Sequence, residues 1–371
     1  MPLTQLNFQP GIDTENTPTG AESKWINCDK VRFRKGLPQK IGGWTKFSTG
    51  YYVGVGRALE QWFGLDGARY EALGTDRKIY AYASGTSQDI TPIRSTDSLT
   101  NAISTTTGSN IITITDTGHG ASQGDFVTLS NVTATVGGIP AATLDAEYEI
   151  LTISNTNAYT IQSSATANAN VAPTANCTAT YQIGIGPAVQ TFGFGWGSGT
   201  WNTGTWGTAR SSSNVVLDAR LWSINNWGED LIITQKDGAT FEWNLSGGMT
   251  NNRCTAVANA PSNSTLSMIS TETRHVVCLG TETEIGNTAS QDKMFIRWSD
   301  QENYNQWSPN VVNSAGSQRI AGGSEIRCAR PAKGTMLVWT DTTMNSMSFI
   351  GPPFIFGFRQ LGNDCGAVGL N

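Results

Sequence analysis

The chain has 371 residues, which is long enough for two or three domains or for one large β architecture that carries an insertion. Charged residues make up 14% and hydrophobic residues 38%, whereas 41 positions are glycine; this composition excludes a mainly helical protein, because helices need Ala, Leu, Glu and Lys. The formal net charge is −5 and no basic run exceeds "KVRFRK" at 30–35, which argues against tight DNA binding by a single chain.

Residues 1–97 are expected to form the first part of a β-propeller-like body. Aromatic strands run through 57–85, where "YEALG" and "KIYAY" flank a turn and predict neighbouring antiparallel strands. In "VRFR", Arg32 and Arg34 fit a solvated edge strand, and contact with a neighbouring subunit is the alternative.

Residues 98–182 change composition abruptly: they contain no Trp, Lys or Arg and are rich in Thr, Ser, Asn and Ala. "NIITIT" and "DFVTLSNV" predict strands on either side of a turn, and "EYEILTISNTNAYTIQ" predicts two alternating strands around an Asn-rich turn. The charged residues here are five acids: Asp116, Asp125, Asp145, Glu147 and Glu149. We therefore expect a small β-sandwich or barrel domain inserted into the body, without an EF-hand-like calcium loop.

Residues 183–371 are again rich in Trp and are expected to form the remainder of the β-propeller body. The segments 219–244, 273–300 and 326–350 share one plan, an alternating strand, a polar turn and a strand that ends near an aromatic residue. Repeats of roughly 40–50 residues are the size of propeller blades. The whole is thus predicted to be all-β. Because "GPPFIFGFRQLGNDCGAVGLN" offers no element that closes a ring, we expect the natural polypeptide to continue past Asn371.

A glycine-rich stretch, "FGFGWGSGTWNTGTWGTAR" (192–210), places Trp196, Trp201 and Trp206 five residues apart. It lacks the lysine of a phosphate-binding P-loop and the βαβ frame of a dinucleotide site. A spacing of five also cannot put three rings on one face of a strand, because faces alternate with period two. We predict a packing role for these tryptophans, and an aromatic platform for a sugar or a partner is the alternative.

Catalytic chemistry has few candidates in this sequence. There are two histidines: His119, predicted to be a turn residue with an unusual backbone angle, and His275, inside a strand; neither is expected to be catalytic. Five acids follow or lie between aromatic strands and are read as turn or edge residues: Glu229, Asp230, Asp300, Glu302 and Asp341. We therefore predict no catalytic, cofactor-binding or metal site and no enzymatic activity.

Cysteine usage and hydropathy indicate the cellular compartment in which the protein is expected. Six cysteines without a C-x-x-C pair predict mainly free, buried thiols in a protein made in a reducing cytosol: Cys28, Cys177, Cys254, Cys278, Cys328 and Cys365. The first residues lack the basic and apolar regions of a signal peptide, and no apolar run approaches the roughly 18–20 residues of a membrane helix. We expect neither classical secretion nor a membrane span.

Several of these segments resemble one protein family. "NCDKVRFRKGLPQKIGGWTKF" (27–47), "WSINNWGEDLIITQKDGATFEWN", "FIRWSDQENYNQWSP" and the region 315–358 are similar to the tail nozzle of short-tailed bacteriophages, also called tail tubular protein B or packaged-DNA stabilisation protein. The stretch 27–47 resembles the first blade of that family. The resemblance covers most of the chain outside the insert.

The resemblance implies a mechanical role in the virion tail. Copies would form a homo-oligomeric ring, commonly sixfold, below the portal and head–tail adaptor proteins, with tail-fibre or tail-tip proteins as further partners. The ring would continue the DNA channel, retain packaged double-stranded DNA and pass it on during ejection, with no cofactor. The alternative is a glycan-binding or glycan-cleaving propeller that acts in attachment to the host cell surface.

Overall fold

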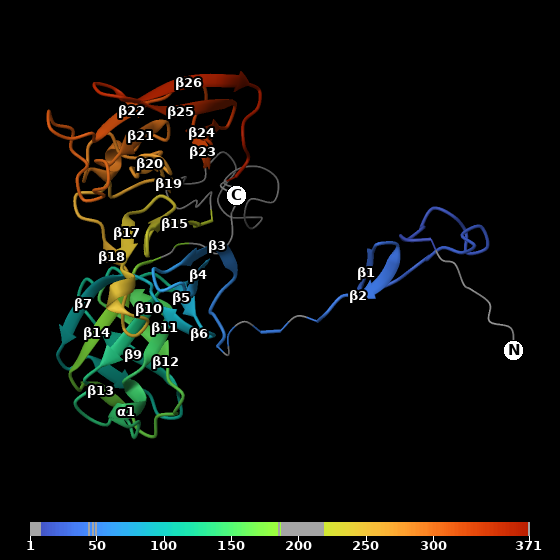
Figure 1. Cartoon of the computed structure of the whole chain (residues 1–371). Coiled ribbons are helices and arrows are strands. Elements are labelled where there is room, and N and C mark those ends of the chain that lie inside the picture. The colour runs from blue at the N-terminus through green and yellow to red at the C-terminus, as the bar shows by residue number, and fades with distance from the viewer. Residues whose placement is uncertain are drawn as a thin grey trace, which may run out of the picture. The chain divides into compact units, whose positions relative to one another are not determined.

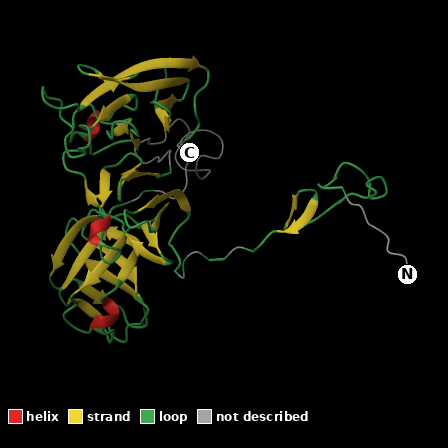
Figure 2. Cartoon of the chain, in the orientation of Figure 1, coloured by secondary structure: helices red, strands yellow, loops and turns green. Residues whose placement is uncertain are grey.

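A computed structural model of the chain describes residues 9–43, 45, 46, 48, 50–184, 186 and 219–369. Its regular secondary structure is almost entirely antiparallel strands, apart from a four-residue helix, α1 (Ala141–Leu144), and short 3₁₀ turns (Figures 1 and 2). This confirms the all-β prediction. The chain divides into two compact units, residues 1–49 and residues 50–371.

The first unit contains one β-hairpin, formed by β1 (Val31–Arg34) and β2 (Leu37–Lys40). Lys35 and Gly36, between the strands, both have positive φ angles, 52° and 80°. Two central residues with positive φ are the geometry of a tight hairpin turn whose twist matches that of its strands. The hairpin belongs to the first of the two units.

The second unit contains four separate four-stranded sheets, each with its strands paired in chain order. The first sheet comprises β3 (Gly56–Phe63), β4 (Arg69–Thr75), β5 (Ile79–Ala83) and β6 (Thr86–Asp89), and the second comprises β15 (Trp222–Trp227), β16 (Asp230–Gln235), β17 (Thr240–Trp243) and β18 (Thr255–Ala256). The third comprises β19 (Leu266–Ile269), β20 (Val276–Leu279), β21 (Phe295–Trp298) and β22 (Gly316–Arg319). The fourth comprises β23 (Ile326–Ala332), β24 (Thr335–Thr340), β25 (Thr343–Gly351) and β26 (Ile355–Asn363). Four-stranded meanders of this kind are the blades of β-propellers.

Consecutive sheets pack face to face through alternating side chains of their strands. In β16, Leu231 and Ile233 pack against the first sheet, whereas Ile232, on the opposite face, packs toward the third. In β20, Cys278 packs toward the second sheet and Val277 toward the fourth. Because both faces of these two strands are covered, β16 and β20 contain continuous apolar runs and not apolar–polar alternations.

The four sheets form an arc that starts at β3 and ends at β23. The first strands of neighbouring sheets lie side by side, β3 with β15, β15 with β19, and β19 with β23. Within the described part of the chain, β3 and β23 lack the extensive contact that joins the other neighbours.

The inserted domain is one eight-stranded antiparallel sheet in the order β13-β8-β9-β12-β11-β10-β14-β7. Its strands are β7 (Ile93–Leu99), β8 (Ile103–Thr105), β9 (Ile111–Thr115), β10 (Phe126–Ser130), β11 (Glu147–Asn155), β12 (Ala158–Gln162), β13 (Val171–Thr174) and β14 (Cys177–Gln182). All except β13 send buried side chains into a single core, around which the sheet curls (Figure 1). The sheet spans residues 93–182, so its first strand begins before residue 98, and the described strands do not close a barrel.

Most of the strands expected from the sequence form. "YEALG" and "KIYAY" are paired neighbours in β4 and β5, and β11 and β12 form the hairpin expected from the Asn-rich turn. The strands β9 and β10 also form where expected, but they do not pair with each other: β9 lies between β8 and β12, and β10 lies between β11 and β14.

Candidate functional site

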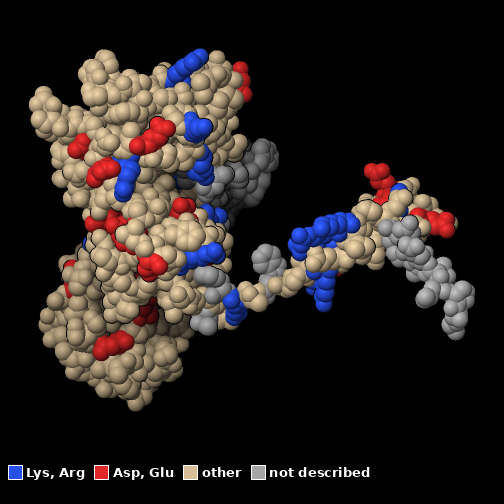
Figure 3. All heavy atoms as spheres, in the orientation of Figure 1, with Lys and Arg blue, Asp and Glu red and all other residues tan. Residues whose placement is uncertain are grey.

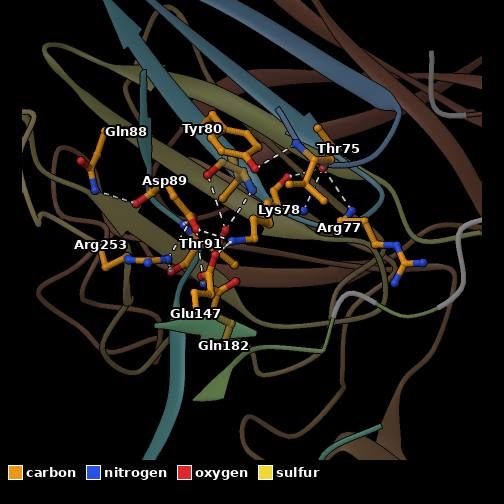
Figure 4. Close-up of polar contacts among 12 residues, drawn as sticks. Thr75, Arg77, Lys78, Tyr80, Gln88, Asp89, Thr91, Glu147, Gln182 and Arg253 are labelled. Atoms are coloured by element: carbon orange, nitrogen blue, oxygen red, sulfur yellow. Dashed lines mark hydrogen bonds and ion pairs between the residues drawn. The ribbon is translucent and has the colours of Figure 1, made fainter. Parts of the chain in front are cut away.

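An ionic network joins the inserted domain to the first sheet, and the buried Lys78 is its centre (Figure 4). Lys78 is 2% exposed and lies in the turn between β4 and β5. Its ammonium group donates to Asp89 Oδ2 at 2.9 Å, makes a short contact with Glu147 Oε2, and lies 4.3 Å from the ring centre of Phe126. Asp89 ends the first sheet, whereas Glu147 and Phe126 belong to the inserted domain.

The turn itself fixes the position of Lys78. The Thr75 hydroxyl oxygen accepts hydrogen bonds from the backbone N–H groups of Arg77 at 3.1 Å and of Lys78 at 2.8 Å. Arg77 in turn reaches the inserted domain, where its guanidinium donates to the Gly124 carbonyl at 3.1 Å and lies 3.3 Å from Glu149. The turn therefore presents two cations to the insert from one rigid loop.

Asp89 receives further partners from the second sheet and from the chain that follows β6. Arg253 lies 2.9 Å from Asp89 Oδ1, and the Thr91 N–H donates to the same oxygen at 2.9 Å. Burial by itself raises the pKa of Asp89, but Lys78 and Arg253 more than offset it, so the pKa is lowered. Lys78 and Arg253 thus meet two carboxylates, Asp89 and Glu147, so that the buried ammonium group of Lys78 has opposite charges beside it.

The sequence did not predict this network. Lys78 and Glu147 are 69 residues apart, and each looks like an ordinary charge between strands. The one available signal was that Glu147 is among five acids in residues 98–182, which contain no Lys or Arg, so a cation that neutralises it must come from outside that segment.

His275 lies beside Ser314 in a geometry that resembles a nucleophile and its base. The ring is fully buried, and its Nε2 lies 2.9 Å from Ser314 Oγ and its Nδ1 lies 2.7 Å from Thr273 Oγ1. However, Ser314 Oγ donates to Asp300 Oδ1 at 2.7 Å and accepts from the Gln301 N–H at 2.9 Å. Burial lowers the pKa of His275 to about 4. The histidine is therefore a neutral packing residue that donates to an already committed hydroxyl.

The prediction for the backbone of His119 is wrong. The positive φ angles of the Gly-His-Gly turn belong to Gly118, at 73°, and Gly120, at 58°, and His119 is not among the residues with positive φ. Its ring is buried, accepts from the Ala121 N–H at 3.0 Å and lies 3.1 Å from the Asn155 carbonyl. The flanking glycines adopt the left-handed angles because they have no Cβ, which leaves His119 free to pack inward.

The acids considered as candidates are dispersed, and four of them accept backbone hydrogen bonds locally or across sheets. Glu229 accepts from Leu65 N, Asp230 from Leu245 N, Asp300 from Ser314 N and Asp341 from Ser324 N. Glu302 is exposed in a turn with φ of 56°. Among the described residues, no group of three or more His, Cys, Asp or Glu side chains is arranged to hold a metal ion.

The remaining residues singled out in the sequence are two arginines, three tryptophans and six cysteines. Arg32 and Arg34 are exposed on β1, where the Arg32 guanidinium donates to Gln39 at 3.0 Å. Trp196, Trp201 and Trp206 lie outside the described residues. The cysteines are free, with Cys177, Cys254 and Cys278 buried, Cys28 and Cys328 half-buried and Cys365 exposed.

A cavity of about 810 Å³ lies at the centre of the arc of sheets. It is lined by the first strands of all four sheets, and its charged lining residues are Arg57, Glu60, Arg274 and Arg330. Burial raises the pKa of Glu60. Arg330, at the opposite end of the arc, lowers that pKa but does not cancel the increase. The sequence did not predict this convergence, because the charges come from three different sheets.

Comparison with known proteins does not assign a family. No protein-family model and no curated protein matches the chain. Among solved structures, the phage phi92 endosialidase is similar over 88% of this chain and 51% of its own, with 11% sequence identity and a TM-score of 0.26. The chain thus spans about half the length of that structure. Among the described residues, no helix is long and apolar enough to cross a membrane.

Proposed function

We propose that this chain is a structural protein of a short-tailed bacteriophage tail, a nozzle subunit whose copies form a ring below the portal and adaptor. The ring continues the DNA channel, retains packaged DNA and passes it on during ejection. The observation that carries the proposal is the buried network around Lys78, which uses charged groups to fix the inserted domain to the first sheet. The resemblance of the aromatic strand segments to the nozzle family supplies the identity of the assembly.

The packing of the four sheets suits a protein that must resist mechanical force. Neighbouring sheets share continuous apolar cores, and Trp243 and Trp307 are fully buried within them. The Trp222 indole N–H donates to the Thr75 carbonyl at 2.8 Å, and the Trp62 indole N–H donates to the Glu229 carbonyl at 2.8 Å, so each ring also ties the first sheet to the second. Close-packed interiors of this kind transmit strain and do not deform easily.

The charge distribution suits a wall along which DNA slides. Residues 50–371 contain 25 Asp and Glu against 17 Lys and Arg, a formal net charge of −8. Residues 95–209, which include nearly all of the inserted domain, contain no Lys or Arg, and the face of that domain in Figure 3 is mostly uncharged. Duplex DNA binds strongly where cations neutralise its phosphates, so a neutral or acidic wall lets it pass.

Electron cryomicroscopy of the particles that contain this protein tests the proposal directly. We expect the four-sheet body to fit density that repeats around the central channel of the tail, from which the ring order follows. If the chain is instead found only at the tail tips, or outside the particle, the nozzle assignment is wrong.

A further inference from the structure

We propose that the central cavity of the four-sheet arc is a binding site for an acidic saccharide, whose carboxylate pairs with the lining arginines. This role goes beyond the proposed tail function and does not depend on it. The cavity, at about 810 Å³, is within the size range of small-ligand sites, about 300–1,000 Å³.

The charge of the lining favours an anion. Arg57 on β3, Arg274 after β19 and Arg330 on β23 line the cavity together with a single described carboxylate, Glu60. The described lining residues therefore carry a formal charge of +2 with Glu60 ionised, and this in a unit whose overall charge is −8. Guanidinium groups bind carboxylates through charge-assisted, often bidentate hydrogen bonds.

The wall holds Arg274 in place through an aromatic contact. Its guanidinium carbon lies 4.7 Å from the ring centre of Trp227, which itself lines the cavity and is 9% exposed. Stacking on an indole ring orients a guanidinium while leaving its in-plane N–H groups available to a ligand. The three arginines come from three sheets, so their positions are set by the packing of the arc and not by one flexible loop.

The remaining lining favours a saccharide over a bare anion. Amide and hydroxyl side chains from the second and third sheets share the wall: Ser223, Asn225, Asn226, Ser270 and Thr271. The Ser223 hydroxyl and the Asn225 amide already donate to the Ser267 carbonyl, and the Asn226 amide donates to the Gly228 carbonyl. This wall therefore offers sugar hydroxyls mainly the oxygen acceptors of these side chains. Glu60 can accept a hydrogen bond from a sugar hydroxyl, and it repels a doubly charged phosphate or sulfate ion more strongly than a single carboxylate.

Calorimetric titration of the full chain with trigalacturonate tests the site, and the fully methyl-esterified trisaccharide is the matched neutral ligand. We expect trigalacturonate to bind at least about tenfold more tightly than the ester, and the difference to shrink as salt is raised. Arg330→Gln should weaken trigalacturonate binding at least about tenfold, whereas Arg359→Gln, the same change at an exposed position on β26, should leave it unchanged. Far-ultraviolet circular dichroism and the melting temperature establish that each variant is folded.

The remaining experiments test whether the cavity recognises a sugar acid. Glu60→Gln keeps the shape and removes the negative charge, so it should tighten trigalacturonate binding and supports the proposal independently if Arg330→Gln fails to fold. Equal binding of the ester, absence of binding at millimolar trigalacturonate, or equal losses in the Arg330 and Arg359 variants would overturn it. So would displacement of trigalacturonate by equimolar inorganic phosphate or by a short DNA duplex, because the site would then recognise phosphate and not a sugar acid.

Discussion

Replacement of Lys78 by Met removes the charge at the centre of the junction and keeps a side chain of similar length. The 2.9 Å separation between Lys78 Nζ and Asp89 Oδ2 corresponds to about 6 kcal/mol of Coulomb attraction at an effective dielectric constant of about 20. Most of that attraction is offset by the desolvation that both groups have already undergone. The variant, however, leaves the half-buried Asp89 with Arg253 as its remaining cation and the 35% exposed Glu147 without Lys78. We therefore expect a loss of unfolding free energy at the lower end of the about 3–5 kcal/mol that removing one partner of a fully buried pair costs.

Two optical probes separate the parts of the molecule in this experiment. The strands Ile93–Gln182 contain no tryptophan, so tryptophan fluorescence reports on the rest of the chain, whereas circular dichroism reports on both parts. In guanidinium chloride we expect Lys78→Met to unfold at a lower midpoint than the wild type. We also expect its fluorescence and dichroism transitions to separate, because the insert loses its attachment.

Lys333→Met makes the same chemical change at an exposed position and is the control. Glu147→Gln is an intermediate case, because the Glu147 side chain is 35% exposed and its pair with Lys78 is partly screened by solvent; we expect a loss of about 1 kcal/mol. If the Lys78 and Lys333 variants lose stability equally, within about 1 kcal/mol, and both probes stay coincident, the network does not hold the insert to the body.

Three further predictions concern residues away from this junction. Burial lowers the pKa of His275 from 6.5 to about 4, so the unfolded chain takes up the proton first as the pH falls. The free energy of unfolding should therefore decrease by up to about 3 kcal/mol between about pH 6.5 and pH 4. In urea denaturation, His275→Gln should lack this part of the pH dependence. A Cβ at Gly74 would lie 2.6 Å from the Trp222 ring, so Gly74→Ala should lower the free energy of unfolding by about 1–3 kcal/mol. Iodoacetamide should label exposed Cys365 in the native protein before the three buried thiols, as mass spectrometry of timed samples would record: Cys177, Cys254 and Cys278.

Each of these has a clear contrary result. An unchanged pH slope in His275→Gln would mean that the ring is not buried in its neutral form. Gly43→Ala, at a position with no neighbour within 4 Å, controls for the general effect of a glycine replacement, and an equal loss there would remove the steric explanation. Native labelling of the buried thiols as fast as that of Cys365 would contradict the packing of the sheets.

The sequence alone predicted the all-β class and several of the strands. The strands "YEALG" and "KIYAY" could be predicted from the local sequence, whereas the strand predicted to alternate within 219–244 is a continuous apolar run in β16, because sheets cover both of its faces. The change of composition near residue 98 is equally local, and it misses the start of β7 at Ile93 because the polar and charged residues of that strand resemble those of the body.

Only the tertiary structure decided which charged groups meet. Lys78 and Glu147 are 69 residues apart, and Arg57, Arg274 and Arg330 approach one cavity from three sheets. It also decided that β9 and β10, expected around one turn, pair with other strands, and that the hairpin at Val31–Lys40 belongs to a unit of its own. Local pattern specifies a strand and its faces, but the partners of a strand and the meeting of distant charges follow from how the sheets pack, because those contacts are separated by long and variable stretches of chain.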